Sequence, residues 1–163
     1  MPFFNAFARL KQEKHDLYKK IEISLVGYCP EQVSSFIEQQ ELDVKIHGIL
    51  APFVAYGELN QADIALWFKY DGSPGDFATK FSDYISINKF MWTFSVKGAV
   101  TDHIEEHKIG KVFYRDDSNL EETIYNAMLN IEKAKERVFN PNYDASTLQI
   151  VNLTDQLLEV LSK

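Results

Sequence analysis

Short stretches in which hydrophobic and polar residues alternate recur along the chain, and this period of two predicts β-strands. The alternation is clearest in residues 89–97, where aromatic side chains occupy every second position from Phe90 to Phe94. Successive side chains of a strand point to opposite faces, so each strand is expected to bury one face and expose the other. The alternating stretches are residues 21–27, 42–50, 62–71 and 89–97, and residues 111–115 are a possible fifth strand.

Apolar residues at helical spacing predict helices between and around these strands. Residues 1–20 carry such a stripe with charges between its members, which predicts an amphipathic N-terminal helix. Pro30 and Pro74 each follow a predicted strand and suit the first turn of a helix, because the missing N–H would have no intrahelical partner there.

The remaining segments are one connection and a helical C-terminal part. Pro52 and Gly57 interrupt residues 51–61, which we expect to be a long connection or an irregular strand edge. Apolar seams predict one helix over residues 118–139 and another over 144–162. Because the link between them is short, these helices are expected to fold back as an antiparallel pair.

In chain order, residues 21–97 are expected to form strand, helix, strand, strand, helix and strand. This order is typical of a ferredoxin-like split β-α-β sandwich, in which helices cover one face of an antiparallel sheet. The expected fold class is α+β, with an extra N-terminal helix, a possible fifth strand and a C-terminal helical hairpin. No linker is apparent, so we expect a single domain over residues 1–163, with the helix at 1–20, the sheet core at 21–115 and the hairpin at 116–163.

The charge balance is acidic, with 24 acidic residues against 17 basic ones and a formal net charge of −7. A negative field repels phosphate backbones and anionic lipids, so we expect neither nucleic acid nor a membrane as a partner. A basic protein is the partner that this charge favours, and a homo-oligomer is an alternative. The residues expected to bind such a partner are Trp67, placed on the outer face of its strand, and Asp102, Glu105, Asp116, Asp117, Glu121 and Glu122.

Cysteine usage indicates the compartment. Cys29 is the single cysteine, so the chain can form no intramolecular disulfide, which fits a reducing environment. No basic segment followed by a continuous apolar run marks a secretory signal, and no apolar run has the length of a membrane-spanning helix. We therefore expect a cytoplasmic protein.

The stretch TDHIEEH, residues 101–107, is the sharpest chemical signal. On a helix, His103 and His107 would share one face and could hold a zinc ion, with Glu106 as the general base of a metal-dependent hydrolase. The segment is short, however, and lacks an apolar stripe that would bury such a helix. We expect a solvated acidic turn or short helix that binds no metal or other cofactor, and keep the zinc hydrolase as the alternative.

Two further sites are weaker. Cys29 lies between a predicted strand and a predicted helix, where the helix dipole favours a thiolate, so a cysteine enzyme is a second alternative. No histidine is near it in the sequence, and a small half-buried side chain is the more ordinary role. The stretches VGYCPE and DGSPGD lack the glycine and lysine patterns of phosphate-binding loops, so no nucleotide site is expected.

The expected function is that of a non-catalytic, acidic protein-binding module. Immunity proteins, inhibitors and secretion chaperones share this size and acidity, and the comparison is one of class. Such a module needs no convergence of titratable groups in a cleft, whereas a hydrolase or a cysteine enzyme does.

Overall fold

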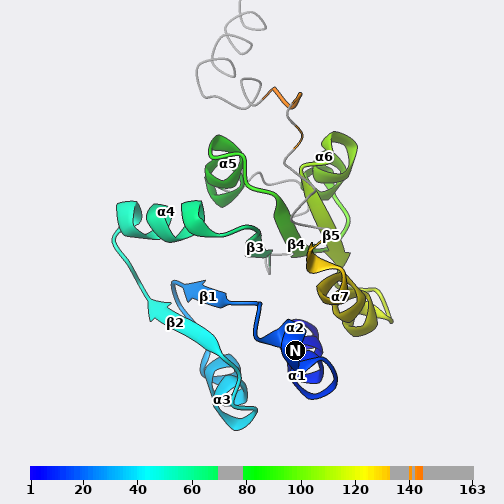
Figure 1. Cartoon of the computed structure of the whole chain (residues 1–163). Helices are drawn as coiled ribbons and strands as arrows, with labels where there is room; N and C mark the ends of the chain where they lie inside the picture. Colours follow the sequence, from blue (N-terminus) through cyan, green and yellow to red (C-terminus); the bar gives the residue numbers. More distant parts are fainter. Residues whose placement is uncertain (70–78, 133–139, 141, 145–163) are drawn as a thin grey trace, which may run out of the picture. The chain divides into compact units, whose positions relative to one another are not determined.

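Figure 1 shows the computed structural model, which describes residues 1–69, 79–132, 140 and 142–144. Two N-terminal helices come first, and from there on each strand within the described residues is followed by one helix. The elements are α1 Pro2–Glu13, α2 His15–Tyr18, β1 Ile23–Val26, α3 Glu31–Gln39, β2 Val44–Gly48, α4 Pro52–Gln61, β3 Ala65–Phe68, α5 Thr79–Ser86, β4 Met91–Ser95, α6 Ala99–His107, β5 Gly110–Tyr114 and α7 Leu120–Leu129.

The sheets of the described residues are parallel, so the predicted antiparallel, ferredoxin-like α+β sandwich is wrong. β1 pairs with β2 in a two-stranded sheet, and β3, β4 and β5 form a three-stranded sheet in that order. The error began at residues 51–61, where Pro52 opens helix α4 and does not break a strand. Because α4 separates β2 from β3, helices and strands alternate as in an α/β fold, whose parallel strands need helical crossovers.

The chain divides into two compact units. The first contains residues 1–63 and 113–136, and therefore helices α1 to α4, the β1–β2 sheet and α7. The second contains residues 64–112 and 137–163, and therefore β3, α5, β4, α6 and the start of β5. The expectation of a single domain stays a prediction.

In the first unit, α1 packs against α7, which lies more than a hundred residues further along the chain (Figure 1). Phe7 and Leu10 of α1 and Ile124 of α7 are completely buried. This burial confirms the amphipathic N-terminal helix, although Lys14 divides it into α1 and α2. Lys11 donates hydrogen bonds to the carbonyls of Gln40 and Glu41, which directly follow α3, a favourable place for a cation because the helix dipole is negative there.

In the second unit, β4 is the central strand, and all five of its residues are buried. Phe81 of α5 contacts both Trp67 of β3 and His103 of α6, with ring centroids 5.8 Å apart in each pair, so both helices lie on one face of the sheet. On the other face, the rings of Phe68 and Phe94 stack 4.6 Å apart. Side chains thus cover both faces of β4, as is usual in parallel sheets.

The predicted outward position of Trp67 is wrong. Its side chain is buried, with 4% of its surface exposed, and the next side chain on the same face, Lys69, is 5% exposed. Alternation failed here because it assumes one solvated face, and a strand of a parallel sheet can be buried on both.

At the C-terminal end, α7 confirms the start of the helix predicted over residues 118–139. α7 ends at Leu129, with Asn130 as its C-cap, earlier than predicted. Residues 133–139 of that predicted helix, residues 145–162 of the next one and the helix start at Pro74 lie outside the described residues. None of the described helices is both long enough and apolar enough to cross a membrane.

Candidate functional site

TDHIEEH forms most of helix α6, so the expectation of a short helix is confirmed. Contrary to the expectation of no apolar stripe, α6 buries Val100, Thr101 and Ile104 within the second unit. The helix ends at His107, and the left-handed backbone of the next residue, Lys108, turns the chain into β5. One side of α6 is therefore buried, and its acidic residues lie on the side that faces solvent.

His103 and His107 lie on one face of α6, as their spacing predicts, with ring centroids 4.3 Å apart. The hydroxyl of Tyr143 lies 2.8 Å from Nε2 of His103, and we call these three residues the histidine cluster. Burial is the main cause that lowers the pKa of His103, and the neighbouring His107 lowers it further. Burial also raises the pKa of the Tyr143 phenol, which therefore stays protonated at neutral pH.

The histidine cluster does not gather the ligands of a metal centre. Within the described residues, no group of three or more histidine, cysteine, aspartate or glutamate side chains is arranged to hold a metal ion. Glu106, the proposed general base, is exposed on α6. The zinc hydrolase thus has two of its named ligands side by side and no third one among these residues.

The acidic residues predicted to bind a partner differ in their surroundings. Asp102 and Glu105 are exposed on α6, in the second unit, and Asp116 is exposed before α7, in the first. Asp117 forms a turn just before α7, where its carboxylate accepts hydrogen bonds from the N–H of Asn119 at 2.8 Å and from the Thr123 hydroxyl at 3.3 Å. Neutralising Asp117 would therefore weaken these two hydrogen bonds as well as remove a surface charge.

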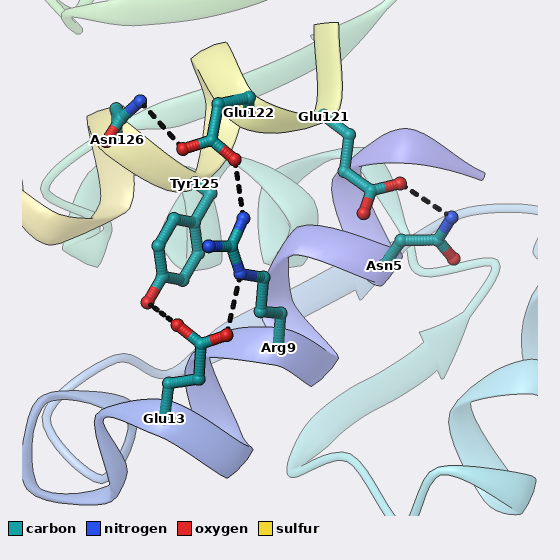
Figure 2. Close-up of polar contacts among 7 residues, drawn as sticks. All are labelled: Asn5, Arg9, Glu13, Glu121, Glu122, Tyr125 and Asn126. Carbon is teal, nitrogen blue, oxygen red and sulfur yellow. Dashed lines mark hydrogen bonds and ion pairs between the residues drawn. The ribbon is translucent and has the colours of Figure 1, made fainter. Parts of the chain in front are cut away.

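Glu121 and Glu122 already have partners within the chain (Figure 2). Glu121 accepts a hydrogen bond from Asn5 at 3.0 Å, and Glu122 pairs with Arg9 of α1. These contacts hold α7 to α1, so both carboxylates have a structural role that the sequence pattern did not reveal.

Arg9 is at the centre of this contact (Figure 2). Its guanidinium bonds Glu13 at 2.9 Å and lies 4.0 Å above the ring of Tyr125, whose hydroxyl donates to Glu13 at 2.7 Å. The hydrogen bond from Arg9 is the main cause that lowers the pKa of Glu13, followed by the one from Tyr125. The carboxylate, guanidinium and phenol thus form one connected network.

Cys29 lies where the sequence predicted, after β1 and before α3. It is half-buried, and its Sγ is 3.8 Å from the carbonyl of Pro30. No imidazole or cationic side chain is among its hydrogen-bond partners in the described residues. The start of α3 is therefore the only feature found here that could favour a thiolate at Cys29, and no imidazole or cation is bonded to it among the described residues.

The sequence analysis did not identify one further candidate site, at the carboxyl ends of β3 and β4. Lys69 directly follows β3, and its backbone N–H bonds the carbonyl of Phe94, which aligns it with Ser95 at the end of β4. Lys69 and Ser95 are 5% and 4% exposed. Three residues further on, α6 begins after Gly98, and we call Lys69, Ser95 and Gly98 the strand-end edge.

A signal for this edge was present in the sequence. Lys69 stands in an otherwise apolar stretch, LWFKY, where a lysine is unusual unless it is paired. The alternation placed Lys69 on a solvated face, because the strand was assumed to be polar on one side.

Comparison of the chain with models of known protein families gives no match, and neither does comparison with curated protein sequences. The function is therefore argued from the geometry alone.

Proposed function

We propose that the chain binds a small anionic molecule, such as a phosphate-bearing metabolite, at the strand-end edge. The observation that carries this proposal is the burial of Lys69 and Ser95 side by side at the carboxyl ends of two parallel strands. In open parallel α/β sheets, ligands bind outside the carboxyl ends of the strands, where the connecting loops leave room. The proposal therefore combines this general rule for parallel α/β sheets with the chemistry of Lys69 and Ser95.

The charges at this edge favour an anion. Lys69 carries a positive charge and has only 5% of its surface exposed, so its field is poorly screened by water. The start of α6 adds backbone N–H groups and the positive end of the helix dipole. The Thr101 hydroxyl accepts the Gly98 N–H at 2.9 Å and donates to the Gly98 carbonyl at 2.8 Å, which fixes the backbone there.

The proposal is tested by calorimetric titration of the whole chain with a nucleoside diphosphate, inorganic pyrophosphate and a dicarboxylate. We expect at least one of them to bind with heat release and Lys69→Met to lose that binding. The matched control is Lys108→Met, because Lys108 is an exposed lysine at the opposite end of α6. If none of the three binds, or if both variants bind equally well, the proposal is refuted.

Lys69→Met removes a buried charge and could unfold the chain, so Lys97→Met is measured as well. Lys97 is exposed two residues beyond β4, and its loss should weaken binding of an anion at the edge without disturbing the core. A folded Lys97→Met variant that binds every probe as tightly as the parent would count against the edge.

A second candidate function is the binding of a basic protein in the cytoplasm. The observation that favours it is the exposed outer face of α6, where Asp102, Glu105 and Glu106 lie at helical spacing. Such a face steers a basic partner, so the association rate should fall as salt screens the charges. We would replace Asp102 and Glu106 by their amides, since Asp117 already accepts hydrogen bonds from Asn119 and Thr123.

To test this, a partner is isolated from the native host and its association kinetics are measured at two salt concentrations. Glu31→Gln is the control, because Glu31 is exposed in the first unit and outside α6. An association rate that ignores both salt and the α6 substitutions would contradict the second candidate.

A further inference from the structure

Helix α4 is apolar, with Glu58 as its single charged residue, yet it buries none of its residues in the part of the chain that the structure describes. It has ten residues, and no side chain caps its start. A helix this short is marginal in water and usually gains most of its stability by packing one face against other elements. Within one chain, α4 therefore lacks the contact that normally stabilises a helix of its length.

Large apolar side chains also gather beside α4, where β1 and β2 end. The Gly27 N–H bonds the Gly48 carbonyl at 2.7 Å, so the residues that follow them, Tyr28 and Ile49, begin at adjacent points of the sheet. Phe53 lies in the first turn of α4, and each of these three side chains is at least 80% exposed. We define the α4 surface as Tyr28, Ile49, Phe53, Val54 and Tyr56, all of them exposed.

The size of the α4 surface is that of an interface core. A whole aromatic side chain has about 150–250 Å² of surface, so Tyr28 and Phe53 alone expose on the order of 300 Å². With its other three side chains the α4 surface reaches about 600 Å², the upper end of the apolar patch that a monomer leaves open. A stable interface covers roughly 800 Å² on each partner, and a polar rim surrounds its apolar core.

The charges around the α4 surface identify the kind of partner. Residues 25–30 and 48–57 carry no charge, so neither a basic nor an acidic partner finds a counter-charge there. Segments that lie in a lipid surface carry lysine or arginine beside their apolar residues. Lys45 is the only such residue within 25–57, and it bonds Glu22 at 2.8 Å. A second copy of the chain brings the same uncharged surface, which can meet its equal about a two-fold axis.

We propose that the chain forms a homodimer in which the α4 surfaces of two copies pack against each other. The contact covers α4 with apolar side chains and so supplies the packing that the helix lacks within one chain. Each chain has a net charge of −7, so the two copies repel each other and burial of apolar surface drives their association. This proposal does not depend on ligand binding at the strand-end edge.

The experiment is sedimentation equilibrium of the whole chain from about 1 µM to about 300 µM, at low and at high salt. The measured mass should rise with concentration to twice the 18.8 kDa of one chain. Salt screens the repulsion between the copies, so the dimer should tighten with salt, which is the opposite of the response to salt expected for a basic partner. The mass of a single chain at every concentration, or a dimer that weakens with salt, would overturn the proposal.

Phe53→Glu tests whether the α4 surface forms the contact. Two carboxylates would face an apolar surface in the dimer, so the dissociation constant should rise at least about tenfold. Because Phe53 is exposed, the substitution removes no core packing. Gln12→Glu is the matched control, since it adds the same charge at an exposed position of α1 and should dimerise as the parent does. Equal dissociation constants in the two variants would refute the assignment.

Dilution of the parent chain locates the contact without a substitution. The amide chemical shifts of Ile49, Phe53 and Val54 should change with concentration in step with the dimer, while that of Gln12 should not. Changes confined to other residues would contradict the proposal. Lipid is the other occupant to examine, with phosphatidylcholine vesicles as the probe: the chain should stay in solution when they are sedimented. Sedimentation of the parent with the vesicles, lost in Phe53→Glu, would assign the α4 surface to lipid and overturn the homodimer.

Discussion

Strands β2 and β4 are both paired in parallel ladders, yet their surroundings are opposite. All five residues of β4 are buried, whereas three of the five residues of β2 are exposed and none is buried. Ile46 of β2 is 42% exposed, while Met91 of β4 is fully enclosed. The same backbone pairing therefore belongs to a core in one unit and to a surface in the other.

This difference shows where each unit obtains its stability. In the second unit, apolar burial on both faces of the sheet dominates, and polar groups such as Lys69 and Ser95 are enclosed at the strand ends. In the first unit, the fully buried side chains Phe7, Leu10 and Ile124 lie on α1 and α7, and a polar network at the rim joins the two helices. The first unit is thus built on a helix pair more than on its sheet.

The largest expected effect comes from emptying the core beside β4. Met91→Ala should lower the free energy of unfolding by about 3 kcal/mol, because it removes a buried side chain and leaves a cavity. Ile46→Ala is the matched change in β2 and should cost less than about 1 kcal/mol, since its side chain is partly in water already. Urea unfolding of both variants measures the two losses in free energy. Equal losses would contradict the difference between β4 and β2.

The next effect concerns two glycines. A methyl group on Gly110 would lie 2.5 Å from the Met91 carbonyl oxygen and 3.0 Å from Ile104, so Gly110→Ala should cost about 2 kcal/mol through overpacking. A methyl group on Gly57, inside α4, meets no atom within 4 Å. Gly57→Ala should therefore stabilise the chain by roughly 0.5–1 kcal/mol, because alanine favours the helix. Thermal unfolding of the two variants should shift in opposite directions.

A smaller effect is expected at the contact between α1 and α7. Tyr125→Phe keeps the ring beneath Arg9 and removes the hydrogen bond to Glu13, so the loss of stability should be less than about 1 kcal/mol. Asn126→Ala is a control on the same helix, where only an exposed bond to Glu122 is lost. If Tyr125→Phe were as damaging as Met91→Ala, the polar network would matter far more than burial.

The smallest effect is a pH dependence. Arg9 and Tyr125 lower the pKa of Glu13 in the folded chain, so the folded state favours the carboxylate. Its contribution is present above the unfolded value of about 4.3 and is lost as the pH falls through the lower folded value. Glu13→Gln should therefore be less stable than the parent at pH 7, and the difference should shrink at pH 3. A constant difference across this range would contradict the assignment.

The sequence predicted individual elements better than their assembly. The alternation around Phe94 and the apolar seam at the start of α7 identified real elements, because local periodicity depends on a strand or helix having a buried side. Strand direction depends on what joins the strands, and reading Pro52 as a strand break removed α4 and turned parallel sheets into an antiparallel one.

The candidate sites show the same limit. The spacing of His103 and His107 correctly placed both rings on one face of a helix. Tyr143, which meets them from 36 positions beyond His107, had no local signal in the sequence. Lys69 and Ser95 come from different strands and are aligned by the register of β3 and β4, which no local pattern specifies.

The most direct test of the ligand proposal is to map amide chemical shifts while a nucleoside diphosphate is added to the whole chain. We predict that the amides of Lys69, Ser95 and Gly98 shift together and saturate, while those of Ala65 and Met91 at the opposite ends of β3 and β4 do not. The shifts should disappear in Lys69→Met and persist in Lys108→Met. Saturable shifts confined to the opposite ends of the strands, or to the β1–β2 sheet, would contradict a site at the strand-end edge.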